Sequence, residues 1–138
     1  MQSDLYQIET EKLAVRNGNL LDELATRLDS HEVLSPLEEQ AMLHLLQVII
    51  ENAIGKARHL LKRRNIKPPV SAYDVFEEML ISKLIDIEQQ NQWKKIVGLR
   101  NTLVHEYMKI QIDIVKDMVK NRHYSFVLDF LLKPFDQF

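Results

Sequence analysis

The stretch from residue 36 to residue 65 constrains the fold more than any other part of the chain. Its apolar residues recur at steps of three and four, the spacing that places side chains on one face of an α-helix. "SPLEE" at its start offers Ser35 as a cap, Pro36 for the first helical position and Glu38 to complete a capping box. We therefore predict a long helix whose core-facing residues are Met42, Leu45, Leu46, Ile49, Ala53, Ala57, Leu60 and Leu61.

The rest of the chain predicts four further helices. A first helix runs from a cap at Ser3 to about Asp29, with a middle weakened by Asn17, Gly18 and Asn19. The prolines of "IKPPVS" end the helix that follows, because proline cannot continue a helix and restricts the residue before it. A short helix then spans 71–84, and two longer ones span about 86–109 and 113–133.

Both terminal helices are expected to bury an apolar face. For the first we predict burial of Leu5, Ile8, Leu13, Leu20, Leu21, Leu24 and Leu28. For the last we predict burial of Val115, Met118, Val119, Phe126, Leu128, Leu131 and Leu132. Trp93 and the methionines are also expected in the core.

Composition favours a single all-α domain over residues 1–138, built as a bundle of four long helices plus one short helix. The chain has 46% hydrophobic residues, 28% charged residues, three Gly and four Pro. No apolar run is long enough for a membrane span, and "MQSDLYQIETEK" does not resemble a signal peptide, so we expect a cytoplasmic protein. The absence of cysteine excludes disulfides, thiol catalysis and thiolate zinc sites.

Charge is distributed unevenly. Residues 1–39 carry nine Asp or Glu against three Lys or Arg, whereas residues 55–67 carry six Lys or Arg and no acid. Two interpretations stay open for the basic run: contact with a polyanion, or a solvated helix end whose cations complement the helix dipole.

"VGLRNTLVHEYMKI", residues 97–110, places four polar groups among apolar residues. On one helix, Asn101 and His105 lie about 40° apart and Arg100 and Tyr107 about 20° apart, but Arg100 and His105 differ by about 140°. Either the long arginine reaches around the helix, or a second copy related by two-fold symmetry completes the site. Our working hypothesis is the second, which predicts a homodimer.

These residues suit cleavage of a phosphodiester. His105 can take a proton from a ribose 2′-hydroxyl or give one to the leaving oxygen. Arg100 can hold the phosphate and stabilise its developing charge, while Asn101 orients His105 or binds substrate. A 2′-hydroxyl nucleophile needs no metal and restricts the reaction to RNA. The other histidines lack ligand spacing, so we expect no metal site and no cofactor.

With these residues the sequence resembles the HEPN superfamily, and within it the HepT-like toxins. The family motif is Arg, a polar residue, three further residues and His, then one residue and Tyr; here it falls on Arg100, Asn101, His105 and Tyr107. "LHLLQVIIENAIGKARHLL", "PPVSAYDVFEEM" and "WKKIVGLRNTLVHEYMKI" extend the resemblance over about residues 35–120.

The resemblance implies a metal-independent endoribonuclease toxin that acts as a homodimer or higher oligomer, with Arg100 and His105 at the subunit cleft. It also implies an antitoxin, an MntA-like minimal nucleotidyltransferase that transfers AMP from ATP to Tyr107. The added nucleotide would place negative charge on the face shared with Arg100. The cations expected to guide RNA are Lys62, Arg63, Arg64, Lys94 and Lys95.

Two other functions remain open. A non-catalytic HEPN module would use Arg100 and His105 to bind nucleotide, or to present substrate to the nucleotidyltransferase. A purely structural helical adaptor ranks last, because it gives these two residues no purpose.

Overall fold

The computed structural model describes residues 2–138, and this range forms helices but no strand, as predicted. None of the helices in it has both the length and the apolar composition needed to cross a membrane. The main helices are α1 (Gln2–Asp29), α2 (Pro36–Arg63), α3 (Ala72–Ile81), α4 (Ile87–His105), α5 (Ile112–Lys120) and α6 (Ser125–Leu132). Two 3₁₀ helices, η1 (Tyr107–Lys109) and η2 (Phe135–Gln137), follow α4 and α6.

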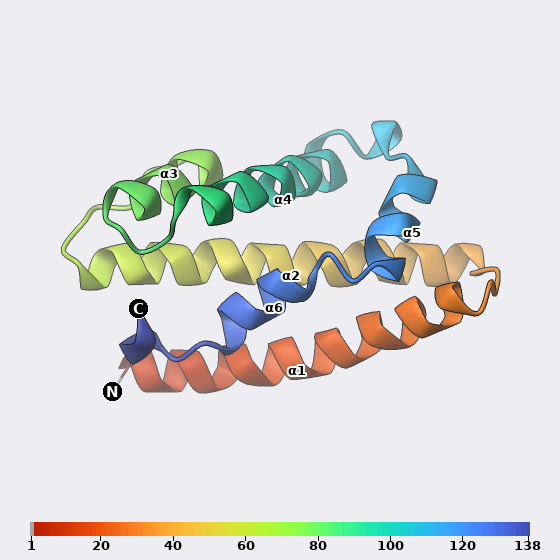
Figure 1. Cartoon of the computed structure of the whole chain (residues 1–138), viewed down its shortest axis with the longest axis horizontal. Helices are drawn as coiled ribbons and strands as arrows, with labels where there is room; N and C mark the ends of the chain where they lie inside the picture. Colours follow the sequence, from red (N-terminus) through yellow and green to blue (C-terminus); the bar gives the residue numbers. More distant parts are fainter. Residues whose placement is uncertain (1) are drawn as a thin grey trace.

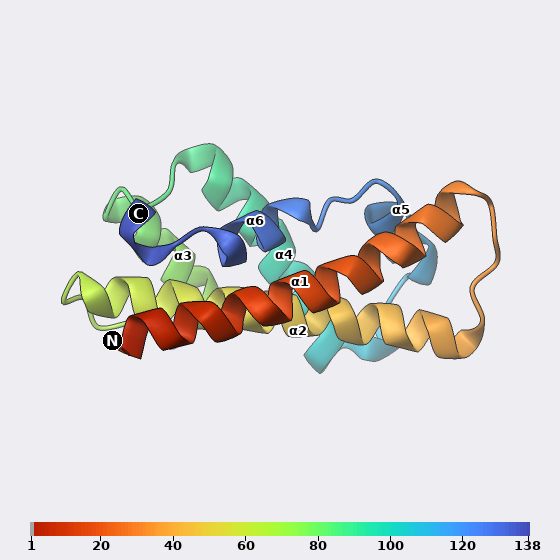
Figure 2. The same cartoon turned by 90° about the horizontal axis from the view of Figure 1, so that it is seen from below.

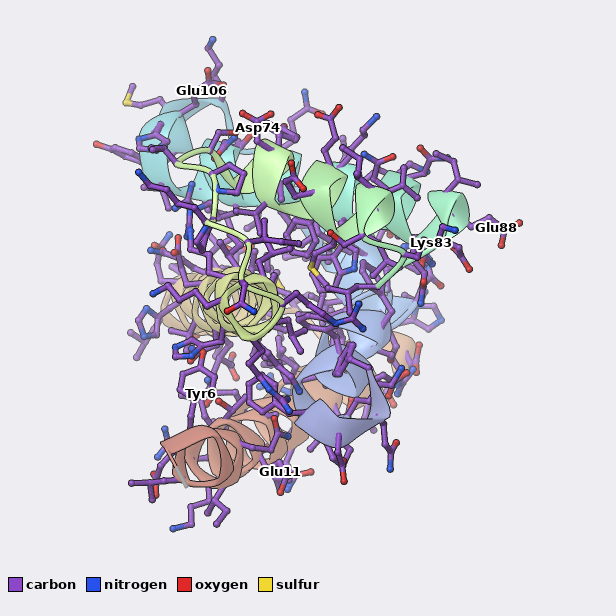
Figure 3. All side chains as sticks on the ribbon, turned by 90° about the vertical axis from the view of Figure 1, so that its left-hand side faces the viewer. Tyr6, Glu11, Asp74, Lys83, Glu88 and Glu106 are labelled. Atoms are coloured by element: carbon purple, nitrogen blue, oxygen red, sulfur yellow. The ribbon has the colours of Figure 1, made fainter. Side chains whose placement is uncertain are left out.

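The long helix α2 is the centre of the bundle, and it packs against α1, α3, α4 and α6. α1 and α2 run side by side in opposite directions, and both chain ends lie where α2 finishes (Figure 1, Figure 2). Viewed nearly along its axis, α2 lies between α1, which carries Tyr6, and α3, which carries Asp74 (Figure 3). The predicted α2 core stripe is confirmed, since Met42, Leu46, Ile49, Ala53, Ala57, Leu60 and Leu61 are buried and Leu45 is half-buried.

Local capping fixes the start of α2 as predicted. The Ser35 hydroxyl accepts a hydrogen bond from the Glu38 backbone N–H at 3.1 Å, and the Glu38 carboxylate accepts one from the Ser35 N–H at 2.8 Å. Arg27, in the last turn of α1, also pairs with the Glu38 carboxylate. The cap therefore joins the end of α1 to the start of α2.

The inner face of α1 differs from the prediction. The helix begins at Gln2, so Ser3 lies inside it and is not its N-cap. Gly18 is buried at a close approach to α6, where an added Cβ would lie 2.9 Å from a methyl carbon of Leu128. This contact requires a small residue at position 18. Three α1 residues that were predicted to be buried, Leu5, Ile8 and Leu20, are exposed.

The predicted fifth helix is two helices, α5 and α6, so residues 2–138 form three long and three short α-helices. The break follows from the backbone of Arg122, which has φ 55° and takes the chain out of the helix. The N–H of His123 donates to the Met118 carbonyl at 3.0 Å and that of Arg122 to the Val119 carbonyl at 2.9 Å, the pattern of a Schellman motif. The same left-handed conformation follows α1, α2 and α3 at His31, Asn65 and Lys83.

One cation of the basic run is part of the core. The side chain of Lys56 is fully buried, and its ammonium donates to the carbonyls of Phe130 at 2.7 Å, Leu131 at 3.1 Å and Lys133. It thereby caps the C-terminal end of α6. Burial lowers the pKa of the Lys56 ammonium to about 8. Lys56 therefore fastens α6 to α2 and is not available to a polyanion.

Trp93 holds the first half of α4 in place. It is buried, as predicted, and stacks on Phe76 of α3 with ring centroids 4.4 Å apart. Phe126 and Phe130 of α6 meet it edge-on at 5.1 and 5.0 Å. Met108 departs from the predicted burial of methionine, because it lies in η1 and is 86% exposed. The aromatic cluster leaves the second half of α4, with the polar motif, free to form a surface site.

Candidate functional site

The polar motif spans the end of α4 and the start of η1. α4 ends at His105 rather than at Lys109, and Glu106 leaves the helical conformation with φ −132° and ψ 36°. The chain has to turn here because α5 packs against α1, on the far side of α2 (Figure 1). Tyr107 therefore lies beyond the helix, and the prediction that it shares a helix face with Arg100 is wrong.

Arg100 is held by two neighbours. Its Nε donates to Oε1 of Glu51 at 2.6 Å, with a longer contact of 3.4 Å from Nη2 to Oε2. Its Nη1 donates to Oδ1 of Asn101 at 3.0 Å. The Arg100 side chain is only 24% exposed. The guanidinium is thus fixed in one orientation at the contact between α2 and α4.

Sequence reasoning missed Glu51. A signal for it exists, because between Glu39 and Lys56 it is the one Asp, Glu, Lys or Arg in a largely apolar stretch. A charge in such a stretch requires a partner when helices pack around it. The identity of that partner depends on how α2 meets α4, which the sequence pattern does not give.

Asn101 and His105 lie in different environments, one bonded to Arg100 and the other exposed to solvent. The Asn101 carbonyl oxygen accepts from Arg100, so this amide orients the arginine. His105 is exposed at the C-terminal end of α4. Among the described side chains, no hydrogen bond joins His105 to either residue. One protomer therefore contains an ordered arginine and, separately, a solvent-accessible histidine.

Two hollows lie along the α2–α4 contact. The smaller, about 180 Å³, is lined by Arg100 and Asn101 together with Arg58 and Tyr73. The larger, about 480 Å³, is lined by Tyr107 and by residues of α2 that include Glu39, Gln40, His44 and Gln47. α4 crosses α2 obliquely (Figure 2), and the two hollows lie at different positions along α2, one at Arg58 and the other at residues 39–47.

The five cations predicted to guide RNA are all exposed, but they do not gather beside Arg100. The Arg63 guanidinium lies 5.1 Å above the ring of Phe135, near the chain ends. Lys95 lines a different hollow, formed with α5 and α6. Neither of the two hollows described above is lined by Lys62, Arg64 or Lys94. Guidance of RNA by these residues stays a prediction.

Fold and site together define a class: a helical bundle that displays an arginine, a histidine and a tyrosine where α4 ends against α2. The sequence pattern of the family described as Ribonuclease HepT-like matches residues 16–133. The chain therefore belongs to the Ribonuclease HepT-like family.

Individual relatives agree with this membership. The chain is 31% identical over 102 residues to the mRNA nuclease HepT of Shewanella oneidensis. The matched region covers 74% of this chain and 69% of the relative. A crystal structure of a toxin-antitoxin with AMP-PNP matches with a TM-score of 0.75 and 21% identity, over 91% of this chain and 97% of the other. The tri-AMPylated HEPN toxin of Shewanella oneidensis in complex with MNT antitoxin matches with a TM-score of 0.75 and 22% identity, over 91% and 96%. These similarities confirm the predicted family and fold.

Proposed function

We propose that the protein is an endoribonuclease toxin of a toxin-antitoxin pair, and that it cleaves RNA without a metal ion. The observation that carries the proposal is the fixed guanidinium of Arg100, held by Glu51 and Asn101 beside a polar hollow. A guanidinium oriented in this way suits a phosphate, and the exposed His105 suits proton transfer. The mRNA nuclease named as a relative supports the same function.

In the proposed reaction, His105 takes the proton of a ribose 2′-hydroxyl, and the 2′-oxygen attacks the neighbouring phosphorus. The bond from phosphorus to the 5′-oxygen then breaks, and that oxygen takes a proton from water. The products carry a 2′,3′-cyclic phosphate and a 5′-hydroxyl. Arg100 binds the non-bridging oxygens, whose negative charge grows in the transition state. Because the substrate supplies the nucleophile, no metal-activated water is needed and DNA is not cleaved.

The cleft of the proposal lies between two copies of the chain. The side chains of Arg100 and His105 leave α4 about 140° apart, and Arg100 is engaged with α2 of its own protomer. A two-fold axis can bring His105 of one copy to Arg100 of the other. Val104 and Met108 lie near His105 in the chain and are 37% and 86% exposed, so they offer apolar surface for this contact.

We further propose that an MntA-like minimal nucleotidyltransferase inactivates the toxin by transferring AMP from ATP to Tyr107. The phenolic oxygen attacks the α-phosphorus, and pyrophosphate leaves. Tyr107 is 66% exposed at the larger hollow, which leaves it accessible to a second protein. Since it lies beyond α4, the added nucleotide blocks the cleft by bulk and charge without sharing a helix face with Arg100. The tri-AMPylated state of the Shewanella toxin supports this regulation.

The test is cleavage of RNA in excess chelator, using protein whose intact mass shows an unmodified Tyr107. We expect the parent to release products ending in 2′,3′-cyclic phosphate, and Arg100→Ala and His105→Ala to release none. Tyr107→Phe should cleave as the parent does but escape inactivation by the nucleotidyltransferase and ATP. Equal cleavage by all variants, or cleavage that the chelator abolishes, contradicts the proposal. Binding of nucleotide without any cleavage would instead favour the non-catalytic HEPN module.

A further inference from the structure

The smaller hollow contains more phosphate-binding groups than the motif supplies. Within the part of the chain that the structure describes, its walls carry the guanidinium groups of Arg58 and Arg100 and no carboxylate. The Asn101 amide and the Ser71 and Tyr73 side chains complete the polar lining. Arginine, amide and hydroxyl donors are the groups that bind phosphate oxygens in complexes with nucleic acids.

The guanidinium of Arg58 has N–H donors that are available to a ligand. Its Nη2 donates to the Val70 carbonyl at 2.7 Å, which ties the loop before α3 to α2. A guanidinium carries five N–H donors, so this one bond leaves the others for a ligand. Arg100, in contrast, is partly neutralised by Glu51. Arg58 therefore supplies the cation of the hollow that no carboxylate of the described residues pairs with.

Tyr73 comes close to α4 because of a glycine. Its hydroxyl oxygen lies 3.3 Å from the place that a Cβ on Gly98 would occupy. The missing side chain lets the phenol reach the helix that carries Arg100. The residue is 42% exposed, so its hydroxyl can still meet a ligand.

Arg58 and Arg100 are set apart along α2, so each can meet a different phosphate. Arg100 bonds to Glu51, and Arg58 follows Glu51 by seven positions on α2, about 10 Å along the axis. The hollow therefore extends from Arg100 towards a second cation, Arg58.

The hollow is small and open to solvent, with a volume of about 180 Å³. A backbone phosphate can therefore enter it from the surface. We infer that the side of the hollow formed by Arg58 and Tyr73 is a subsite for the RNA backbone phosphate next to the one that Arg100 holds for cleavage. The inference rests on the proposed nuclease function and specifies how its substrate is held.

The experiment measures RNA binding separately from cleavage. In the His105→Ala chain, the Kd for a fluorescent single-stranded RNA oligomer is measured by anisotropy over a range of salt concentrations. Adding Arg58→Gln should weaken binding about tenfold and reduce the salt slope by about one phosphate contact. Tyr73→Phe, which removes only a hydroxyl, should weaken binding a few-fold and carries the test should Arg58→Gln fail to fold. Arg16→Gln, an exposed arginine on α1, is the control and should change neither value.

A second measurement separates the subsite from a structural role of Arg58. With His105 intact, Arg58→Gln should raise the KM for the oligomer but leave cleavage of a dinucleoside monophosphate unchanged, since that substrate has only the scissile phosphate. Equal losses on both substrates, or parent-like binding and salt slope, overturn the subsite. A His105→Ala chain that binds no RNA overturns the proposed function as well. Binding that depends on Arg58 in a chain that never cleaves contradicts the nuclease alone.

Discussion

Replacing Glu51 by glutamine separates the orientation of Arg100 from its charge. The Glu51 carboxylate accepts from the guanidinium at 2.6 and 3.4 Å and links α2 to α4. Both side chains are partly exposed, at 39% and 24%, so solvent screens the pair. We therefore expect the free energy of unfolding to fall by only about 1 kcal/mol. For a chain of this length the melting temperature then falls by about 3 °C.

The effect of Glu51→Gln on catalysis should exceed its effect on stability. Without the carboxylate, Arg100 samples orientations that do not meet the phosphate, and kcat for RNA cleavage falls about tenfold. KM should stay constant or fall, because a negative charge is removed from beside the substrate. Asp29→Asn is the matched control, since it breaks a similarly exposed pair with Arg122 at 3.0 Å, away from the site. A Glu51→Gln enzyme with parent kcat would refute the positioning role.

Three further changes test other parts of the structure. Lys83→Gly should raise the free energy of unfolding by about 0.5 to 1 kcal/mol in urea titrations, because the exposed Lys83 has φ 61°, which glycine adopts without strain; an unchanged or lower value contradicts this. Burial lowers the pKa of Lys56 to about 8 from 10.5, so between these values the unfolded chain holds more protons and stability should rise with pH. Subtracting the free energy of unfolding of Lys56→Met, measured over the same pH range, isolates this contribution. A contribution that falls as pH rises would contradict the expected sign. Met108→Glu should convert the dimer to a monomer in light scattering and abolish RNA cleavage while circular dichroism stays unchanged, and an active dimer would count against the proposed interface.

Helix starts were predictable because their signals are local. Ser35, Ser71 and Asp86 cap their helices through bonds to residues three positions further along the chain. Helix ends were harder to predict, because the residues with left-handed backbone conformation that close four of the helices are not glycine. At Arg122 the helix is interrupted, and α5 and α6 each pack against α1. Local helix propensity does not predict this interruption, because it depends on tertiary packing.

The candidate site was predictable only along α4. Arg100, Asn101, His105 and Tyr107 follow from spacing and resemblance, since they fall within eight positions of one another. Glu51 lies 49 positions from Arg100, and their contact exists only because α2 packs on α4. The two hollows are lined by Arg58 and His44 of α2 and by Tyr73 of α3, because both helices pack against α4. Helix periodicity indicates which face of α2 is buried, but not which position along α4 each residue meets.

The most direct test of the shared cleft mixes two inactive chains. Arg100→Ala and His105→Ala are each expected to cleave no RNA, and equal amounts are unfolded together, refolded together and assayed in chelator. If Arg100 of one copy acts with His105 of the other, half of the dimers are mixed and each contains one complete site, so about a quarter of the parent activity should return. A mixture that cleaves no more RNA than the two variants do separately would contradict an active site built from two copies of this chain.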